Sequence, residues 1–473
     1  MTKSVREARS FKETAGLVVG AGFVAAGFFL PPVMGLSHEA LLSLGILMGA
    51  VCLWFCGSMA TGVVGVLASL LLLVLGVVPS FDVAFSGYVS TTTWFVLAVF
   101  CMTALMQRST LGARLTRRFI AWAGDDTRKL VLAIMTVTAL CSSVMTDTGA
   151  VALSMSFALP LLETVGARRG ESNLGRCLML GISFGALIGG FTTPIGHSLN
   201  VLAMGILQTQ TGYVVPFLTW MAYGVPIACV MVPAAWWGLV RAFPPEPIAP
   251  GEVEGILDGQ FRFGTLDRRD WTCLVMLVAL PVLWILGNWV DALAPTTVAL
   301  VGFVLLFVPG LDIISWRDFE ALASWNLFLF FGGVLSIGAA LTSTGAAAWI
   351  AEAFLGSGIL ALPVFASLAV VAVALVLLST VFPIAPSWVV IFLPPLLTYA
   401  QLTGLPLTVP TFLSVCLMAG SYLVPLAPAL NMTLDTGYYR FGEEARSGWL
   451  TQVILIAVAV GWSFALGMAF GVA

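Results

Sequence analysis

Two short polar segments in this sequence carry residue types that bind ions or small anions. They are Thr146-Asp147-Thr148 and the segment that contains Thr193, Gly196, His197, Ser198 and Asn200. Hydroxyl, amide and carboxylate oxygens coordinate hard cations, and a carboxylate or an imidazole can also carry a proton. Each segment interrupts a long apolar stretch, and backbone that is not helical persists at membrane depth only where it is buried in protein or lines a cavity. We therefore expect both segments at a binding site.

The composition predicts a polytopic membrane protein. Of the 473 residues, 60% are hydrophobic and 9% are charged, whereas a soluble domain has roughly 25% charged residues. The apolar segments leave no room for a sizeable soluble domain, and the net charge of −3 gives no indication of nucleic acid as a partner. The eight cysteines lie in apolar segments without metal-ligand spacing, so we interpret them as core residues. No cofactor is expected beyond a coupling ion, Na+ or H+.

The first half of the chain divides into scaffold spans and a repeat. Residues 1–107 are expected to form N-terminal scaffold spans. Basic residues between Arg108 and Lys129 place the following surface segment in the cytoplasm. The apolar stretch 130–165 is too long for one span, has basic residues on both sides, and is therefore expected to be an inner re-entrant hairpin. The first repeat, 108–240, continues with a broken helix at 177–208.

The second half repeats this order with the opposite orientation. Residues 241–270 are expected to form a cytoplasmic linker and 271–325 further scaffold spans. The second repeat, 326–438, contains an outer re-entrant hairpin at 359–400 and a broken helix at 408–438, and 439–473 forms the last span. No Lys or Arg flanks the outer hairpin. The expected architecture is an all-α inverted-repeat transporter of about 11 spans, with the N-terminus cytoplasmic and the C-terminus external.

At these segments the sequence resembles the divalent anion/sodium symporter family, whose members carry Ser-Asn-Thr at each hairpin tip and Gly-Thr-Pro-Pro-Asn or Ala-Thr-Pro-Pro-Asn at each broken crossing. Thr146-Asp147-Thr148 resembles the first tip, with Asp in place of Asn. Gly196 to Asn200 resembles the first crossing, and Ala427 to Asn431 the second. The second tip matches either Ile384-Ala385-Pro386 or Ser379-Thr380-Val381. The resemblance implies a homodimer with an elevator mechanism.

The resemblance also implies roles for individual residues. Substrate contacts are expected from Thr146, Asp147, Thr148, Thr193, Gly196, His197, Ser198, Asn200, Pro428 and Asn431. Ion coupling is expected from Ser142, Thr146, Asp147, Gly196 and Thr380, with sodium bound at Ser142, Asp147 and Gly196. Two simpler interpretations stay open: Asp147 as an acid that only caps a helix, and His197 as a packing residue.

The function predicted from these observations is a secondary carrier of small anions in the inner membrane. The substrate would be a di- or tricarboxylate or another oxyanion, coupled to a proton or to sodium, or exchanged. A sodium/proton antiporter or a metalloid-oxyanion exporter of the same superfamily is the alternative. A channel or an intramembrane enzyme is a third alternative. The sequence shows no nucleophile with a base and no metal-ligand cluster, as an enzyme would need, and no ring of charges, as a channel would need.

Overall fold

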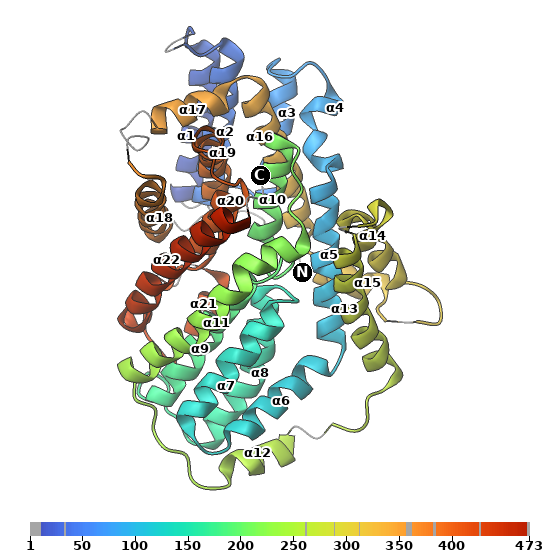
Figure 1. Ribbon diagram of the computed structural model, residues 1–473, viewed down its shortest axis with the longest axis vertical. Coiled ribbons are helices and arrows are strands. Elements are labelled where there is room, and N and C mark those ends of the chain that lie inside the picture. Colours follow the sequence, from blue (N-terminus) through green and yellow to red (C-terminus); the bar gives the residue numbers. More distant parts are fainter. Residues whose placement is uncertain are drawn as a thin grey trace, which may run out of the picture.

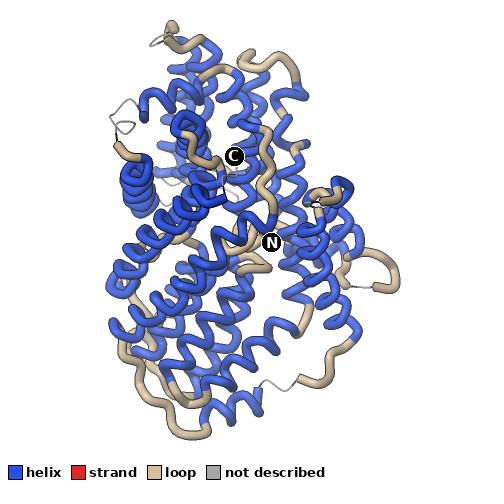
Figure 2. The backbone as a smooth tube through the Cα atoms, in the orientation of Figure 1, coloured by secondary structure: helices blue, strands red, loops and turns tan. Residues whose placement is uncertain are grey.

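The protein is built from helices. The computed structural model describes residues 11–32, 35–260, 263–287, 289–311, 313–355, 362–381, 385–424 and 427–470, and all regular secondary structure in these ranges is helical (Figures 1 and 2). The helices are α1 (Phe11–Phe29), α2 (His38–Cys56), α3 (Thr61–Val74), α4 (Phe81–Ala84), η1 (Ser86–Val89), α5 (Thr91–Arg108), α6 (Leu111–Ala123), α7 (Thr127–Ser142), α8 (Asp147–Thr164), α9 (Asn173–Gly190), α10 (Ser198–Thr211), α11 (Phe217–Ala242), α12 (Glu252–Gln260), α13 (Arg268–Leu286), η2 (Asp291–Leu293), α14 (Pro295–Leu305), α15 (Trp316–Leu322), α16 (Trp325–Ser343), α17 (Ala346–Leu355), α18 (Val364–Val381), α19 (Ala385–Thr403), α20 (Thr408–Ala419), α21 (Pro428–Leu434) and α22 (Glu443–Phe470). Seven of the described helices are long and apolar enough to cross a membrane. The predicted fold class, an all-α polytopic membrane protein, is confirmed.

The order of helices in the first half recurs in the second half. The helix α5 is followed by the short amphipathic helix α6, the hairpin of α7 and α8, the broken crossing of α9 and α10, and the long helix α11. The same order is found in α16, α17, the hairpin of α18 and α19, the broken crossing of α20 and α21, and α22. At the start of the first repeat, α5 and α6 are bent by 63° relative to one another.

A row of glycines lets α9 lie directly against α7. Gly181, Gly185 and Gly189 recur every four residues along one face of α9. A Cβ atom at Gly185 would lie 2.5 Å from the carbonyl oxygen of Met135, and one at Gly189 would lie still closer to the carbonyl oxygen of Ala139. Small residues at this spacing allow two helix backbones to approach closely. The contact holds the ends of α7 and α9 together, and both helices end at one of the predicted polar segments.

The two halves interlock through their broken helices. The helix α10 contacts α16, α19 and α20 of the second half, and α21 contacts α8 and α9 of the first half. The hydroxyl of Ser183 in α9 donates to the carbonyl oxygen of Ala429 at 3.0 Å and lies 2.6 Å from the hydroxyl of Thr433 in α21. The centre of the molecule is therefore made by both halves.

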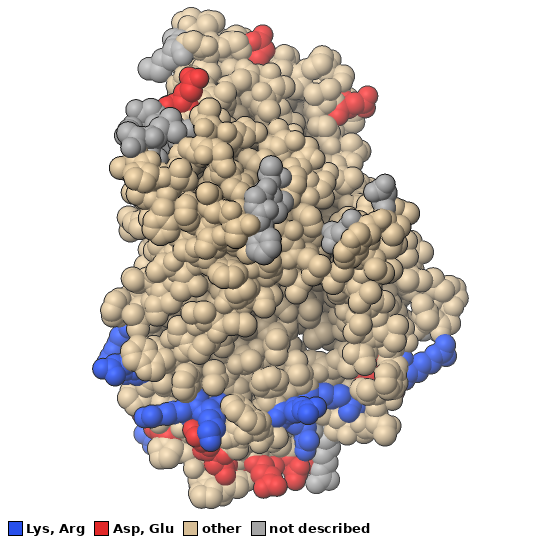
Figure 3. Space-filling model, viewed as in Figure 1, with Lys and Arg blue, Asp and Glu red and all other residues tan. Residues whose placement is uncertain are grey.

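The linker between the halves is bound to the basic end of the molecule, where the Lys and Arg side chains visible in Figure 3 gather. The carboxylate of Glu246 accepts the backbone N–H groups of Asn173 and Leu174 at the start of α9, at 2.7 and 2.6 Å. Asp125 accepts the N–H groups of Gly251 and Val253 next to α12. Burial raises the pKa of the Glu246 carboxyl, but the hydrogen bonds from α9 outweigh burial and hold this pKa below its ordinary value.

Candidate functional site

The first predicted segment forms the turn between α7 and α8. Thr146 precedes α8, and its Oγ1 accepts a hydrogen bond from the N–H of Gly149 at 3.3 Å, as an N-cap does. The N–H of Thr146 donates to Oγ1 of Thr103 in α5 at 3.3 Å. Asp147 is the first residue of α8, where the free N–H groups and the helix dipole stabilise a negative charge.

The second predicted segment forms the break between α9 and α10, and a proline explains why α9 ends. Gly190 is the last residue of α9, and Pro194, four residues later, has no N–H to donate to the Gly190 carbonyl. The side-chain Nδ2 of Asn200 donates to that carbonyl instead, at 2.8 Å, and also to the carbonyl of Thr193 at 2.7 Å. The buried amide of Asn200 therefore replaces the missing backbone donor.

A histidine caps the start of α10. Nδ1 of His197 accepts a hydrogen bond from the N–H of Leu199 at 3.0 Å. An Nδ1 that accepts carries no hydrogen, so the hydrogen of the neutral imidazole lies on Nε2. Nε2 lies 3.6 Å from Oδ2 of Asp147, and the two side chains are 14% and 13% exposed. The cap thus directs the Nε2–H group towards the carboxylate. The sequence predicted that the two segments meet at one site, but not that these two side chains face each other.

The pair lies in a cavity of about 690 Å³ that residues of both halves line. The lining comes from α3, α5, α8, α10, α16 and the second hairpin and crossing, with polar side chains that include Thr103, Gln107 and Asn326. Among the described residues that line this cavity, Asp147 and His197 are the only ionisable ones. From these described residues an anion would meet hydroxyl, amide and imidazole groups but no Lys or Arg.

The predicted site residues fall into separate groups. Six of them line the cavity, namely Thr146, Asp147, Thr148, His197, Ser198 and Pro428. Ser142, Thr193, Gly196 and Asn200 are buried residues of the adjoining helix end and break. Asn431 is exposed. Thr380 lies in the last turn of α18, where its hydroxyl donates to the carbonyl oxygen of Val376 at 2.7 Å, and its neighbour Ser379 lines the cavity.

Two registers were predicted for the second hairpin tip, Ile384-Ala385-Pro386 and Ser379-Thr380-Val381. Residues 382–384 lie outside the described residues. Neither triplet contains an acid, so in both registers the second tip has no counterpart of the Asp147 carboxylate.

The two asparagines that the motif comparison pairs lie in different surroundings. Asn200, the third residue of α10, is fully buried, whereas Asn431, the fourth residue of α21, is exposed. Their equivalence stays a prediction.

The buried side of the first break has the oxygen atoms that a hard cation needs. A Cβ at Gly196 would lie 2.6 Å from the carbonyl oxygen of Gly190 and 2.8 Å from that of Ser142, so backbone oxygens converge where only glycine fits. The hydroxyl of Ser142 donates to the carbonyl oxygen of Ala186 at 2.7 Å. Oδ1 of Asn200 is buried and has no hydrogen-bond partner among the described residues. An acceptor left in this way costs about 1–3 kcal/mol, which a bound cation would offset.

Several polar residues of the cavity were missed by the sequence analysis. Thr103 and Gln107 interrupt an otherwise apolar span, and Ser324 and Asn326 lie at the start of α16. Asn326 donates to the hydroxyl of Thr61 at 2.8 Å. Isolated polar residues in apolar spans were the available signal.

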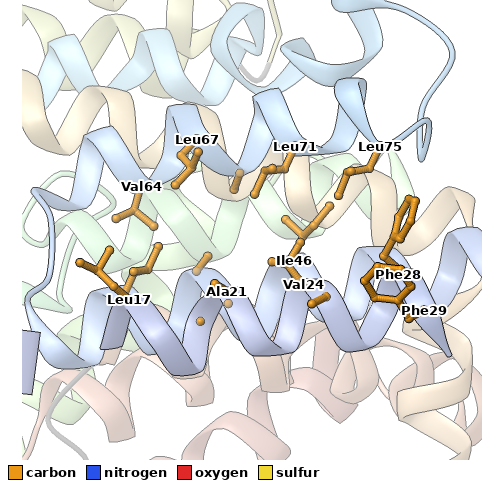
Figure 4. Close-up of a pocket in the computed structure, with 16 residues that line it drawn as sticks. Leu17, Ala21, Val24, Phe28, Phe29, Ile46, Val64, Leu67, Leu71 and Leu75 are labelled. Carbon is orange, nitrogen blue, oxygen red and sulfur yellow. The ribbon is translucent and has the colours of Figure 1, made fainter. Parts of the chain in front are cut away.

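A second cavity lies between α1, α2 and α3 (Figure 4). It has a volume of about 380 Å³, and all of its described lining residues are apolar, among them Leu17, Phe28 and Leu71. It offers neither charge nor hydrogen-bond donors, so it is not a candidate site for an anion or a cation.

Several known membrane proteins and transporters are similar to this chain in sequence. A Staphylococcus saprophyticus protein named sodium-dependent dicarboxylate transporter SdcS is 25% identical over 335 residues, which cover 65% of this chain and 64% of that protein. A Cupriavidus necator membrane protein is 23% identical over 69% of this chain and 64% of its own length. A Haemophilus influenzae protein named uncharacterized transporter is 21% identical over 92% of this chain and 94% of its own.

The chain thus spans about 64% of the length of the first two relatives. The crystal structure of the Alcanivorax borkumensis YdaH transporter is similar with a TM-score of 0.49 and 14% identity, over 80% of this chain and 84% of that one. Residues 12–472 match the family described as sodium:sulfate symporter transmembrane region, so the chain belongs to this family of divalent anion/sodium symporters.

Proposed function

We propose that this protein is a secondary transporter of small anions, with a di- or tricarboxylate or another oxyanion as substrate. One observation carries the proposal: the two helix breaks of the first half bring the starts of α8 and α10 to a single polar cavity that is also lined by the second half. Discontinuous helices that present their N-termini at mid-membrane hold anionic groups in transporters. The names of the family and of the SdcS relatives, sodium:sulfate symporter and sodium-dependent dicarboxylate transporter, agree with this chemistry.

The substrate anion would be bound by dipoles and neutral donors. The described lining residues supply the hydroxyls of Thr148 and Ser198, the amide of Asn326 and the Nε2–H of His197, and they include no Lys or Arg. A doubly charged anion therefore needs a positive partner during transport. We assign that role to a cation that moves with it, either sodium or a proton.

The oxygen atoms beside the first break suit sodium. The candidate ligands are the unpartnered Oδ1 of Asn200 and the backbone carbonyl oxygens that converge at Gly196, among them that of Ser142. This arrangement modifies the set expected from the sequence, Ser142, Asp147 and Gly196, because the Ser142 hydroxyl donates to Ala186 and the Asp147 carboxylate faces His197. Thr380 is retained as a weaker candidate near the second tip.

The movement that carries the anion would be that of an elevator in a homodimer in the inner membrane. The cavity is lined by helices expected to belong to the scaffold, α3 and α5, and by helices of the hairpins and crossings, α8, α10 and α21. Contacts between the two groups, such as the packing of α10 against α5 and the hydrogen bond from Thr146 to Thr103, would have to break when the second group slides. The basic end in Figure 3 would face the cytoplasm.

Uptake by proteoliposomes tests the proposal. Purified protein should import labelled succinate or sulfate into vesicles when an inward sodium gradient or an inward proton gradient is imposed, and protein-free vesicles should not. Sodium–proton exchange without uptake of any anion would instead support the antiporter, for which Asp147, the one acid of the described cavity, would be the exchanging group.

A further inference from the structure

We propose that the paired ends of α11 and α22 form a binding site for an anionic phospholipid. Arg241 and Arg446 would hold its phosphate group, and its acyl chains would lie on exposed apolar faces of the two helices. Neither arginine is among the described residues that line the central cavity. Occupancy of this surface site therefore does not depend on which anion the protein carries.

The register of α11 and α22 brings the two arginines to one end of the helix pair. The helices lie antiparallel and in contact (Figure 1). Towards one end, Nε1 of Trp462 donates to the carbonyl oxygen of Ala222 at 2.9 Å. Towards the other end, a Cβ atom at Gly238 would lie 3.4 Å from the carbonyl oxygen of Ser447. Gly238 precedes one arginine by three residues and Ser447 directly follows the other, so both arginines lie at this second end.

Each helix has an exposed face that is apolar up to its arginine. In α11 the exposed residues at a spacing of four are Val225, Cys229, Pro233, Trp237 and Arg241. In α22 the exposed residues at helical spacing are Arg446, Trp449, Val453 and Ala457. Trp237 and Trp449 are 48% and 55% exposed, and tryptophan is enriched where the membrane core meets the headgroups. A phospholipid whose chains lie along these faces would therefore place its headgroup at the arginines.

The two arginines have no acidic partner among the described residues, although other arginines do. Those paired with Asp318, Asp270, Asp258 and Glu443 are Arg108, Arg114, Arg117 and Arg176. The guanidinium of Arg241 instead lies over the ring of Trp237, 5.4 Å from its centroid. That of Arg446 lies over the ring of Phe243 at 5.2 Å. Stacking on a ring leaves the N–H groups of a guanidinium available for a phosphate, which it binds with two parallel hydrogen bonds.

The acids at the start of α22 are already bound within the protein. Glu443 pairs with Arg176 at 3.0 Å and accepts the N–H of Arg440 at 2.8 Å. Glu444 is buried and accepts the N–H of Gly442 at 3.0 Å. On the face shown in Figure 3, acidic side chains gather mainly below the row of Lys and Arg side chains. A phosphate at the level of the arginines would therefore meet positive charge.

Lipid binding to the purified protein tests the site. The protein in detergent is titrated with dioleoyl phosphatidylglycerol and with dioleoyl phosphatidylcholine, which share their acyl chains and differ in net charge, and bound lipids are counted by native mass spectrometry. A basic residue next to an anionic lipid surface contributes about fivefold in affinity. The wild type should therefore prefer phosphatidylglycerol by about 25-fold.

Paired substitutions separate these two arginines from the charge of the whole basic end. Arg241→Gln with Arg446→Gln should abolish the preference, and Arg241→Lys with Arg446→Lys should keep most of it. Arg118→Gln with Arg317→Gln is the matched control, because it removes the same charge from exposed arginines of α6 and α15 and should keep the preference. Glycerol phosphate, a headgroup without acyl chains, should not displace phosphatidylglycerol at equal concentration.

Four results would overturn the site. They are equal binding of the two lipids by the wild type, a preference that survives in the paired Gln variant, an equal loss in the control pair, and displacement of the lipid by glycerol phosphate. The third would show that total charge attracts the lipid, and the fourth that the arginines bind soluble phosphate compounds. Because binding is measured without transport, each of these results would leave the proposed function intact.

Discussion

Replacing Asn200 with alanine should destabilise the first helix break by an amount that the structure allows us to work out. The carbonyl of Gly190 would lose Nδ2 of Asn200, its only partner among the described residues, because Pro194 has no N–H. A buried carbonyl left alone costs about 1–3 kcal/mol. The carbonyl of Thr193 keeps the N–H of Gly196 at 3.3 Å, so its loss is nearer 1 kcal/mol. With sodium present to satisfy Oδ1 of Asn200, so that the substitution relieves no unpartnered acceptor, we expect a total of about 2–4 kcal/mol.

Thermal unfolding of the purified protein in detergent measures this cost. Midpoints should be compared at one heating rate, since proteins of this size often unfold irreversibly. Asn431→Ala is the matched control, because this asparagine is exposed and its removal should change stability by about 0.5 kcal/mol or less. Equal destabilisation by the two substitutions would refute the assignment of Asn200 as the donor that seals the break.

The same unfolding measurement tests whether sodium binds at the first helix break. Sodium at about ten times its dissociation constant should stabilise the wild type by about 1.4 kcal/mol over potassium at equal ionic strength. Asn200→Ala also removes Oδ1, the unpartnered oxygen, so its midpoint should respond much less to sodium. An undiminished sodium response in this variant would show that the cation binds elsewhere.

Two further predictions concern stability. The hydrogen bonds of the Glu246 carboxylate to α9, which lower its pKa, stabilise the protein above the ordinary carboxyl pKa of about 4.3 and are lost as the pH falls through the lowered value. Glu246→Gln should therefore reduce the free energy of unfolding by about 0.5–2 kcal/mol at neutral pH and so lower the unfolding midpoint, and its difference from the wild type should vanish in acid. Gly448→Ala should prevent normal folding because its Cβ would overlap the carbonyl oxygen of Tyr422. Gly461→Ala, in the same helix with open space around it, should fold normally, as fluorescence-detected gel filtration would show.

The architecture followed from the sequence because its signals are strong and local. Hydrophobic length, the polar interruptions at Asp147 and His197, and the basic clusters were enough to predict hairpins and broken helices in both halves. Helix caps were readable too, since Thr146 precedes α8 and accepts from Gly149 as its residue type suggests.

The contents of the cavity were harder to predict because they depend on contacts across the fold. The pairing of His197 with Asp147 joins residues from two different interhelical segments, and no periodicity in the sequence indicates how far apart such residues lie in space. Thr103 and Asn326 come from helices whose apolar pattern gave little reason to single out one face. The motif comparison also gave no sign that Asn200 is buried and Asn431 exposed, because burial depends on the helices packed around each break.

The interlocking of the two halves has a consequence for biosynthesis. The helix α10 ends at Thr211, but three of the helices that surround it, α16, α19 and α20, begin only at Trp325 and beyond. A chain leaving the ribosome therefore inserts its first hairpin and first crossing long before their partners exist. During that interval a helix with a polar start must be sheltered by the insertion machinery or by lipid. Substitutions that impair production of the protein without altering the finished transporter are expected to concentrate in α10 for this reason.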